Sequence, residues 1–91
     1  MEPIQVKCWW RYLIKHPKFT GCLINKINNK AWYKNGKRHR EDGPASEWKS
    51  GYKEWWLNDM RYNSEQDYKI AVRKVKLVRV LKRLDNENNM V

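Results

Sequence analysis

The sequence predicts an α+β fold that is mainly β: an antiparallel β-hairpin meander built from two degenerate repeats and closed by a basic C-terminal α-helix. A Trp-containing segment with a tight-turn signal occurs at residues 32–39 and again at residues 55–62, an offset of 23 residues. From residue 68 to residue 84 the chain then has no Gly, Pro or acidic residue, and its apolar residues follow helical spacing. A chain of 91 residues is expected to form a single domain, residues 1–91.

The first part of the chain, residues 1–29, is predicted to be an N-terminal β segment. Residues 8–14 are apolar, aromatic and β-favouring, so we expect a strand there. A second strand is expected at residues 20–24, followed by a polar turn at residues 25–29. Whether residues 1–25 join the sheet of the repeats stays open at this point.

The middle of the chain, residues 30–63, is predicted to hold the hairpin repeats. Asn35-Gly36 indicates a type I′ turn, because both central residues of that turn need positive φ. Asn58-Asp59 occupies the same place in the second copy with weaker turn formers. The hairpin strands are expected at residues 32–34 and 37–39 and at residues 53–57 and 60–62, with turns at residues 42–44 and 50–51 and a short extended segment at residues 45–48.

Side chains of the second hairpin must point to both faces of the sheet. Trp55 and Leu57 share one face and Trp56 takes the other, because side chains alternate along a strand. One of these tryptophans is therefore exposed unless another segment covers it. The N-terminal segment and the C-terminal helix are the two candidate covers.

The C-terminal segment is predicted to be a basic helix at residues 64–84, followed by a frayed tail at residues 85–91. Ser64 stands where an N-cap would, and two acidic residues follow in the first turn. The alternating pattern at residues 75–80 leaves a strand as the alternative. On a helix, the apolar residues form two nearly opposite stripes: Tyr68, Ala71, Val72, Val75 and Val78 on one, and Ile70, Leu77, Leu81 and Leu84 on the other. Such a helix either packs on both sides or leaves the domain at its far end.

The string at residues 32–45 resembles a known repeat. It is similar to the W-Y-x-N-G-K-x-H-R-E-D-G-P-A repeats of small proteins from bacteriophages and large DNA viruses, which are distant relatives of the membrane occupation and recognition nexus repeats. The likeness covers residues 30–68, although the second copy keeps little beyond Trp55, Trp56, Asn58 and Arg61. The resemblance implies a hairpin meander and a viral setting, and it implies turn or packing roles for the motif residues rather than an activity.

The charge of the chain points to an anionic partner. There are 20 Lys and Arg against 10 Asp and Glu, a formal net charge of +10, and the excess lies at the two ends of the chain. Such a field attracts nucleic acid, an anionic membrane or an acidic protein surface without distinguishing them. Aromatic side chains beside cations would also suit single-stranded nucleic acid. The predicted binding residues are Lys69, Arg73, Lys74, Lys76, Arg79, Lys82, Arg83, Trp9, Trp10, Arg11 and Trp56.

Residues 39–42, His-Arg-Glu-Asp, are the one cluster that could perform acid–base chemistry. On an extended strand His39 and Glu41 can converge while Arg40 points elsewhere, so we interpret the cluster as ion pairs around a turn. The spacing of Cys8, His16 and Cys22 is not that of a zinc site, and reduced thiols are expected. We expect no enzyme activity, no metal and no cofactor.

Two functions fit these features. The first is a small phage accessory protein that binds and inhibits or redirects a host protein, with a nucleic-acid-handling defence enzyme as the suggested target. The second is a direct nucleic-acid-binding protein with little sequence preference. No apolar run is long enough for a signal peptide or a membrane span, so the cytoplasm of an infected host cell is the expected location.

Overall fold

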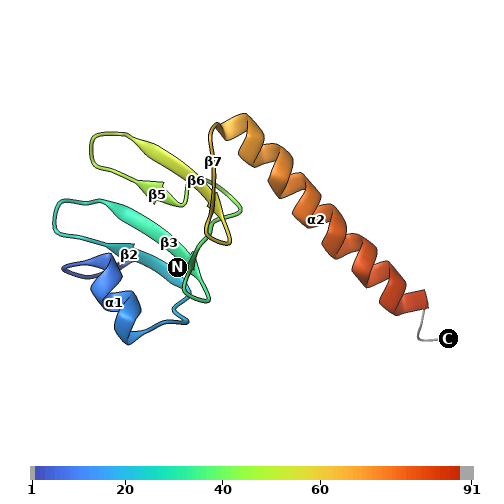
Figure 1. Cartoon of the computed structure of the whole chain (residues 1–91), viewed down its shortest axis with the longest axis horizontal. Coiled ribbons are helices and arrows are strands. Elements are labelled where there is room, and N and C mark those ends of the chain that lie inside the picture. Colours follow the sequence, from blue (N-terminus) through green and yellow to red (C-terminus); the bar gives the residue numbers. More distant parts are fainter. Residues whose placement is uncertain (1, 89–91) are drawn as a thin grey trace.

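The computed structural model describes residues 2–88 and has seven strands and two helices (Figure 1). The strands form one mixed sheet in the order β1-β2-β3-β5-β6-β7, with β4 paired to β3 beside β5. All neighbours are antiparallel except β1 and β2, which are parallel. The elements are β1 (Ile4–Gln5), α1 (Trp9–Lys15), β2 (Gly21–Ile24), β3 (Lys30–Lys34), β4 (Lys37–Arg38), β5 (Ser46–Glu47), β6 (Lys53–Leu57), β7 (Met60–Tyr62) and α2 (Glu65–Asn88). The predicted α+β class, mainly β with a C-terminal helix, is confirmed.

The 23-residue repeat is present in the strand register and not only in the sequence. Leu23 lies opposite Ala31 in the first copy, and Ser46 lies opposite Glu54 in the second. Each residue of the second pair stands 23 positions after its counterpart in the first. The connecting turns repeat as well, since the backbone bond from Asn25 N–H to the Asn29 carbonyl, 3.1 Å, recurs between Trp48 and Tyr52 at 2.9 Å. Each repeat is therefore a hairpin that begins one strand before the Trp-containing segment.

Both tight turns have the predicted conformation. Asn35 and Gly36 have φ of 52° and 81°, and Asn58 and Asp59 have φ of 48° and 67°. These are the positive values that a type I′ turn requires. The first turn is also held from outside, because Gly36 N–H donates to the carbonyl of Phe19 at 2.9 Å.

The N-terminal segment differs from the prediction. Residues 8–14 were expected to be a strand, which is wrong: Trp9–Lys15 is the helix α1. One face of this helix packs on the cluster that contains Leu23 and Tyr33. The face is formed by Trp9, Tyr12 and Leu13, whose spacing of three and four residues makes them neighbours on a helix. This tertiary contact outweighs the β propensity of the aromatic residues. Because β1 and β2 belong to the sheet, residues before position 25 do join the repeats.

The C-terminal helix is longer than predicted. The Ser64 hydroxyl oxygen accepts a hydrogen bond from Asp67 N–H at 3.1 Å, which confirms the N-cap. The helix then runs to Asn88, so the prediction of a tail from residue 85 is wrong for residues 85–88, and residues 89–91 lie outside the described part. Nothing between residues 65 and 88 breaks a helix, since there is neither Gly nor Pro. The strand alternative at residues 75–80 is excluded.

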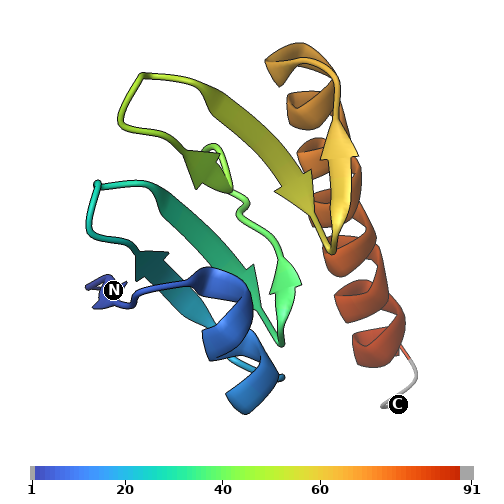
Figure 2. The same ribbon diagram turned by 60° about the vertical axis from the view of Figure 1, so that its left-hand side comes forward.

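The two helices cover opposite faces of the sheet (Figure 2). One small core, around Leu23, Ala31 and Tyr33, lies under α1, and a second, around Leu57, Tyr68 and Val72, lies between α2 and the second hairpin. Trp55 packs against the second core. Trp56 lines a pocket with residues of α1 on the other face. Both predicted covers are thus used, one for each tryptophan.

The position of Gly36 gives a test of the fold. A Cβ built on Gly36 would lie 1.8 Å from the carbonyl oxygen of Pro17, whereas a Cβ on Gly51, whose φ is +97°, would meet nothing within 4 Å. Gly51→Ala should therefore cost only the backbone strain, about 1 kcal/mol. Gly36→Ala should cost about 2 kcal/mol or more, because the Pro17 backbone must also move. Urea unfolding of both variants measures this, and equal costs would contradict the contact.

Candidate binding surfaces

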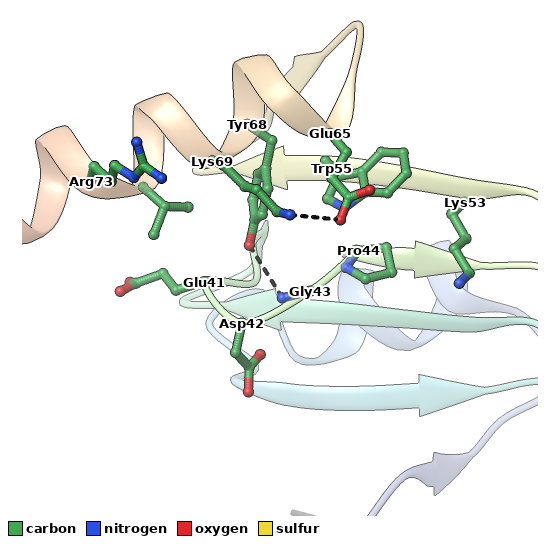
Figure 3. Close-up of a pocket in the computed structure, with 11 residues that line it drawn as sticks. Glu41, Asp42, Gly43, Pro44, Lys53, Trp55, Glu65, Tyr68, Lys69 and Arg73 are labelled. Carbon is green, nitrogen blue, oxygen red and sulfur yellow. Dashed lines mark hydrogen bonds and ion pairs between the residues drawn. The ribbon is translucent and has the colours of Figure 1, made fainter.

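The first turns of α2 are anchored by Tyr68. Its side chain is 4% exposed, and its hydroxyl donates to the carbonyl of Arg40 and accepts from Gly43 N–H at 3.3 Å (Figure 3). Burial raises the pKa of this hydroxyl, so it stays a neutral donor. The loop between β4 and β5 is thereby fixed against α2.

Three turns further along α2, Arg79 makes a second attachment. Its guanidinium donates to both carboxylate oxygens of Glu41, each at 2.6 Å. Hydrogen bonds from Arg79, and then from His39, hold the pKa of Glu41 at about 2 despite its partial burial. The helix is therefore fixed at two points, Tyr68 and Arg79.

His39 connects this ion pair to the second hairpin. The Nδ1 atom of His39 accepts from Asn58 N–H at 3.0 Å, and Nε2 lies 2.9 Å from Glu41. Because Nδ1 accepts, the proton lies on Nε2, which donates to the carboxylate. The predicted convergence of His39 and Glu41 is confirmed. Arg40 points elsewhere, as expected: it stacks on Trp32 at 3.9 Å and pairs with Asp42 at 2.9 Å. With both ring nitrogens engaged, His39 acts here as a packing and bridging residue.

The predicted basic residues of α2 divide into two groups. Lys69 pairs with Glu65 at 3.4 Å, and Arg79 is held by Glu41. For the remaining cations, no ion pair is found among residues 2–86, whose side chains are described. All of them are exposed: Arg73, Lys74, Lys76, Lys82 and Arg83. The helix thus carries a cationic surface that is largely separate from its attachment to the sheet.

A pocket of about 630 Å³ lies where α2 meets the loop at residues 41–44 (Figure 3). Its wall carries three cations and three carboxylates: Lys53, Lys69 and Arg73, and Glu41, Asp42 and Glu65. The mixture of charges gives no preference for an anion. This pocket is better described as the seam between helix and loop than as a ligand site.

The predicted aromatic residues lie on the opposite face. Trp9, Trp10 and Trp56 line a pocket of about 300 Å³ together with Arg38. The Arg38 guanidinium lies 5.6 Å from the Trp9 ring and 5.1 Å from the Trp56 ring, and the Trp56 indole donates to Glu54 at 3.1 Å. These two rings are partly buried, whereas Trp10 is 60% exposed with Arg11 over it at 5.4 Å. The eleven predicted residues therefore form two surfaces, not one.

Sequence reasoning missed three residues that organise these surfaces. Tyr68 was expected only as an apolar helix residue, Glu41 was not paired with Arg79, and Arg38 was not singled out. Arg38 does have a sequence signal, since Arg61 stands 23 positions later in the repeat. Both arginines approach Glu54, at 3.9 Å and 3.6 Å. No such signal links residues 41 and 79.

The ion pair of Glu41 predicts a dependence of stability on pH. Because the pKa of Glu41 is lowered from 4.5 to about 2, its contribution is complete above pH 4.5 and is lost as the pH falls towards 2. Thermal unfolding of Glu41→Gln should therefore show a shallower loss of stability over this range than the unmodified chain shows. The control is Glu65→Gln. The Glu65 carboxylate also lies in an ion pair, but it is 55% exposed, so this variant should keep the original slope of stability against pH. An unchanged slope in Glu41→Gln would contradict the anchoring role of the pair.

Comparisons with known proteins add no further information on these surfaces. No protein-family model, no curated protein and no solved structure matches the chain. Over residues 2–88, neither helix is long and apolar enough to cross a membrane.

Proposed function

We propose that this chain is a non-enzymatic binding protein in which the hairpin sheet is a scaffold and α2 is the arm that contacts an acidic surface of a partner protein. One observation carries the proposal: α2 extends from the sheet (Figure 1), and besides its two anchoring residues it carries exposed cations along its length. Clustered like charges lower stability through repulsion, so a partner that neutralises them would bind favourably.

The setting we propose is viral. It is supported by the resemblance of residues 32–45 to repeats of small bacteriophage proteins. In this setting the chain acts in the cytoplasm of an infected cell, where it binds and inhibits or redirects a host protein. A nucleic-acid-handling defence enzyme is the suggested target, because such an enzyme binds nucleic acid through charged surfaces and acts against an infecting phage.

A second candidate function is direct binding of nucleic acid. It is favoured by Trp10, whose ring is 60% exposed beside Arg11. Bases can stack on such a ring while cations follow the phosphates. This surface and the cations of α2 lie on different faces of the sheet, however, so a single strand would have to pass around the domain to use both.

Charge reversal on α2 tests the protein-binding proposal. Arg73, Lys74, Lys76 and Lys82 are changed together to Glu, leaving Arg79 in place because it anchors the helix. The control reverses four exposed lysines of the sheet domain, Lys7, Lys15, Lys18 and Lys26, and has the same net charge. A partner captured from nuclease-treated host lysate should be retained by the control variant and lost by the α2 variant. Retention by both variants would contradict the proposal.

The same variants decide the nucleic-acid alternative. If α2 binds phosphates, the affinity for a single-stranded oligonucleotide should fall steeply with salt, and removing four contacts should reduce the slope of log K against log salt by about 3. Protein binding predicts instead that oligonucleotide affinity is weak and that the two variants have similar slopes. A large slope change in the α2 variant alone would favour the alternative.

A further inference from the structure

The side of α2 that faces away from the sheet carries a stripe of exposed aliphatic residues. The buried residues Tyr68 and Val72 lie on the opposite side of the helix, against the second hairpin. The outward residues recur at intervals of seven and of three or four positions, which is the spacing of a helix-pairing seam. These residues, here called the outer stripe, are Ile70 (42% exposed), Leu77 (58%), Val80 (47%), Leu81 (51%) and Leu84 (48%).

We propose that the outer stripe of α2 is a docking seam for an acidic amphipathic helix of a partner protein. The inference rests on the proposed function and specifies how the partner is recognised. From Ile70 to Leu84 the stripe extends about 21 Å along the helix axis, about four helical turns, and Arg73 interrupts it between Ile70 and Leu77. Helix-in-groove and coiled-coil recognition use side chains with this spacing.

The charges beside the outer stripe select the kind of helix. Lys69, Lys76 and Arg83 recur every seven residues along one edge, and Lys74 lies at the other edge. Lys69 pairs with Glu65 one turn earlier, but the sequence has no acidic residue between positions 68 and 84. In paired helices the residues that flank the seam determine partner choice through opposite charges. A partner with Glu or Asp beside its own apolar seam therefore satisfies both features of α2.

The same charges disfavour a second copy of this chain. Two α2 helices paired through their outer stripes would place lysine and arginine edges against each other, and like charges that face each other oppose association. Nucleic acid would use the cations but would leave the aliphatic side chains without a partner.

A designed peptide provides a direct probe. The peptide is a labelled helix of two heptads, the length of the stripe, with Leu at the seam positions and Glu at both flanks, and its control is a scrambled peptide of the same composition. Fluorescence anisotropy with the full chain should show binding of the patterned peptide at least about tenfold tighter than binding of the scrambled one. Equal affinities would mean that charge alone is recognised and would overturn the proposal.

Substitutions then locate the contact. Leu77→Gln combined with Leu81→Gln removes two outer-stripe side chains without changing the charge, and both positions are exposed, so the fold should be retained as judged by circular dichroism. The matched control is Ile14→Gln with Met60→Gln, which removes two apolar side chains exposed elsewhere by 70% and 61%. Peptide affinity should fall by about tenfold or more in the first variant and by less than about twofold in the second.

The other possible occupants are outcomes of the same set of measurements. Sedimentation that shows a dimer dissociated by the Leu77 and Leu81 changes would assign the stripe to a second copy. Binding to phosphatidylserine vesicles that depends on the same leucines would assign it to a membrane surface. Either result would overturn the acidic-helix proposal.

The failure of this inference is distinguishable from failure of the proposed function. If the host partner is lost by the α2 charge-reversal variant but kept by the leucine variant, the arm binds through charge and the helix-pairing inference is wrong. If both variants keep the partner, the proposed function itself is wrong. Loss in both variants, with retention in both controls, is the expected result.

Discussion

The orientation of α2 depends on the contacts that Tyr68 and Arg79 make with residues 40–43. Tyr68 fixes the first turns through the Arg40 carbonyl and Gly43 N–H, and Arg79 fixes the helix three turns later through Glu41. Two attachment points on the same side of a helix determine its rotation about its own axis as well as its direction. The side that carries these two residues must face the loop, so the opposite side must face away from it. The exposure of the outer stripe is therefore a consequence of this docking.

The placement of the acidic residues reduces repulsion within the sheet domain of a chain whose net charge is +10. In the sheet domain each of four carboxylates lies beside a cation: Glu41 beside Arg79, Asp42 and Glu47 beside Arg40, and Glu54 beside Arg38 and Arg61. Two of these cations also stack on aromatic rings: Arg40 on Trp32, and Arg38 on Trp56. Neutralisation inside the sheet reduces repulsion where the chain must pack. Along most of α2 no acid is present, so the repulsion that remains there lies on a solvated helix and does not oppose packing of the sheet.

Local signals in the sequence predict the local parts of the fold, and long-range contacts determine the rest. Asn35-Gly36 predicts a turn correctly because the requirement for positive φ belongs to those two residues alone. The helix α1 is not predictable from residues 8–14, because their aromatic and β-branched residues favour a strand. The helix is stabilised by a tertiary contact: Trp9, Tyr12 and Leu13 pack on a core formed by strands later in the chain. The Arg79–Glu41 pair joins positions 38 residues apart, which neither repeat nor periodicity connects. For this reason the basic side chains of α2 were predicted as one set of binding residues, whereas among residues 2–86 the structure divides them into ion-paired and unpaired residues.

The register of the second hairpin connects the repeat architecture to the arm. In β6, Trp55 and Leu57 point to the face that receives α2, while Trp56 points to the face that α1 covers. A slip of one residue would exchange these faces, because side chains alternate along a strand, and would present Trp56 in place of Leu57 to Tyr68 and Val72. The Asn58-Asp59 turn prevents the slip, since Asp59 N–H donates to the Arg38 carbonyl at 2.9 Å and the Asp59 carboxylate accepts from Arg38 N–H at 2.7 Å. The turn of the second repeat therefore determines which stripe of α2 is buried against the hairpin and which is exposed.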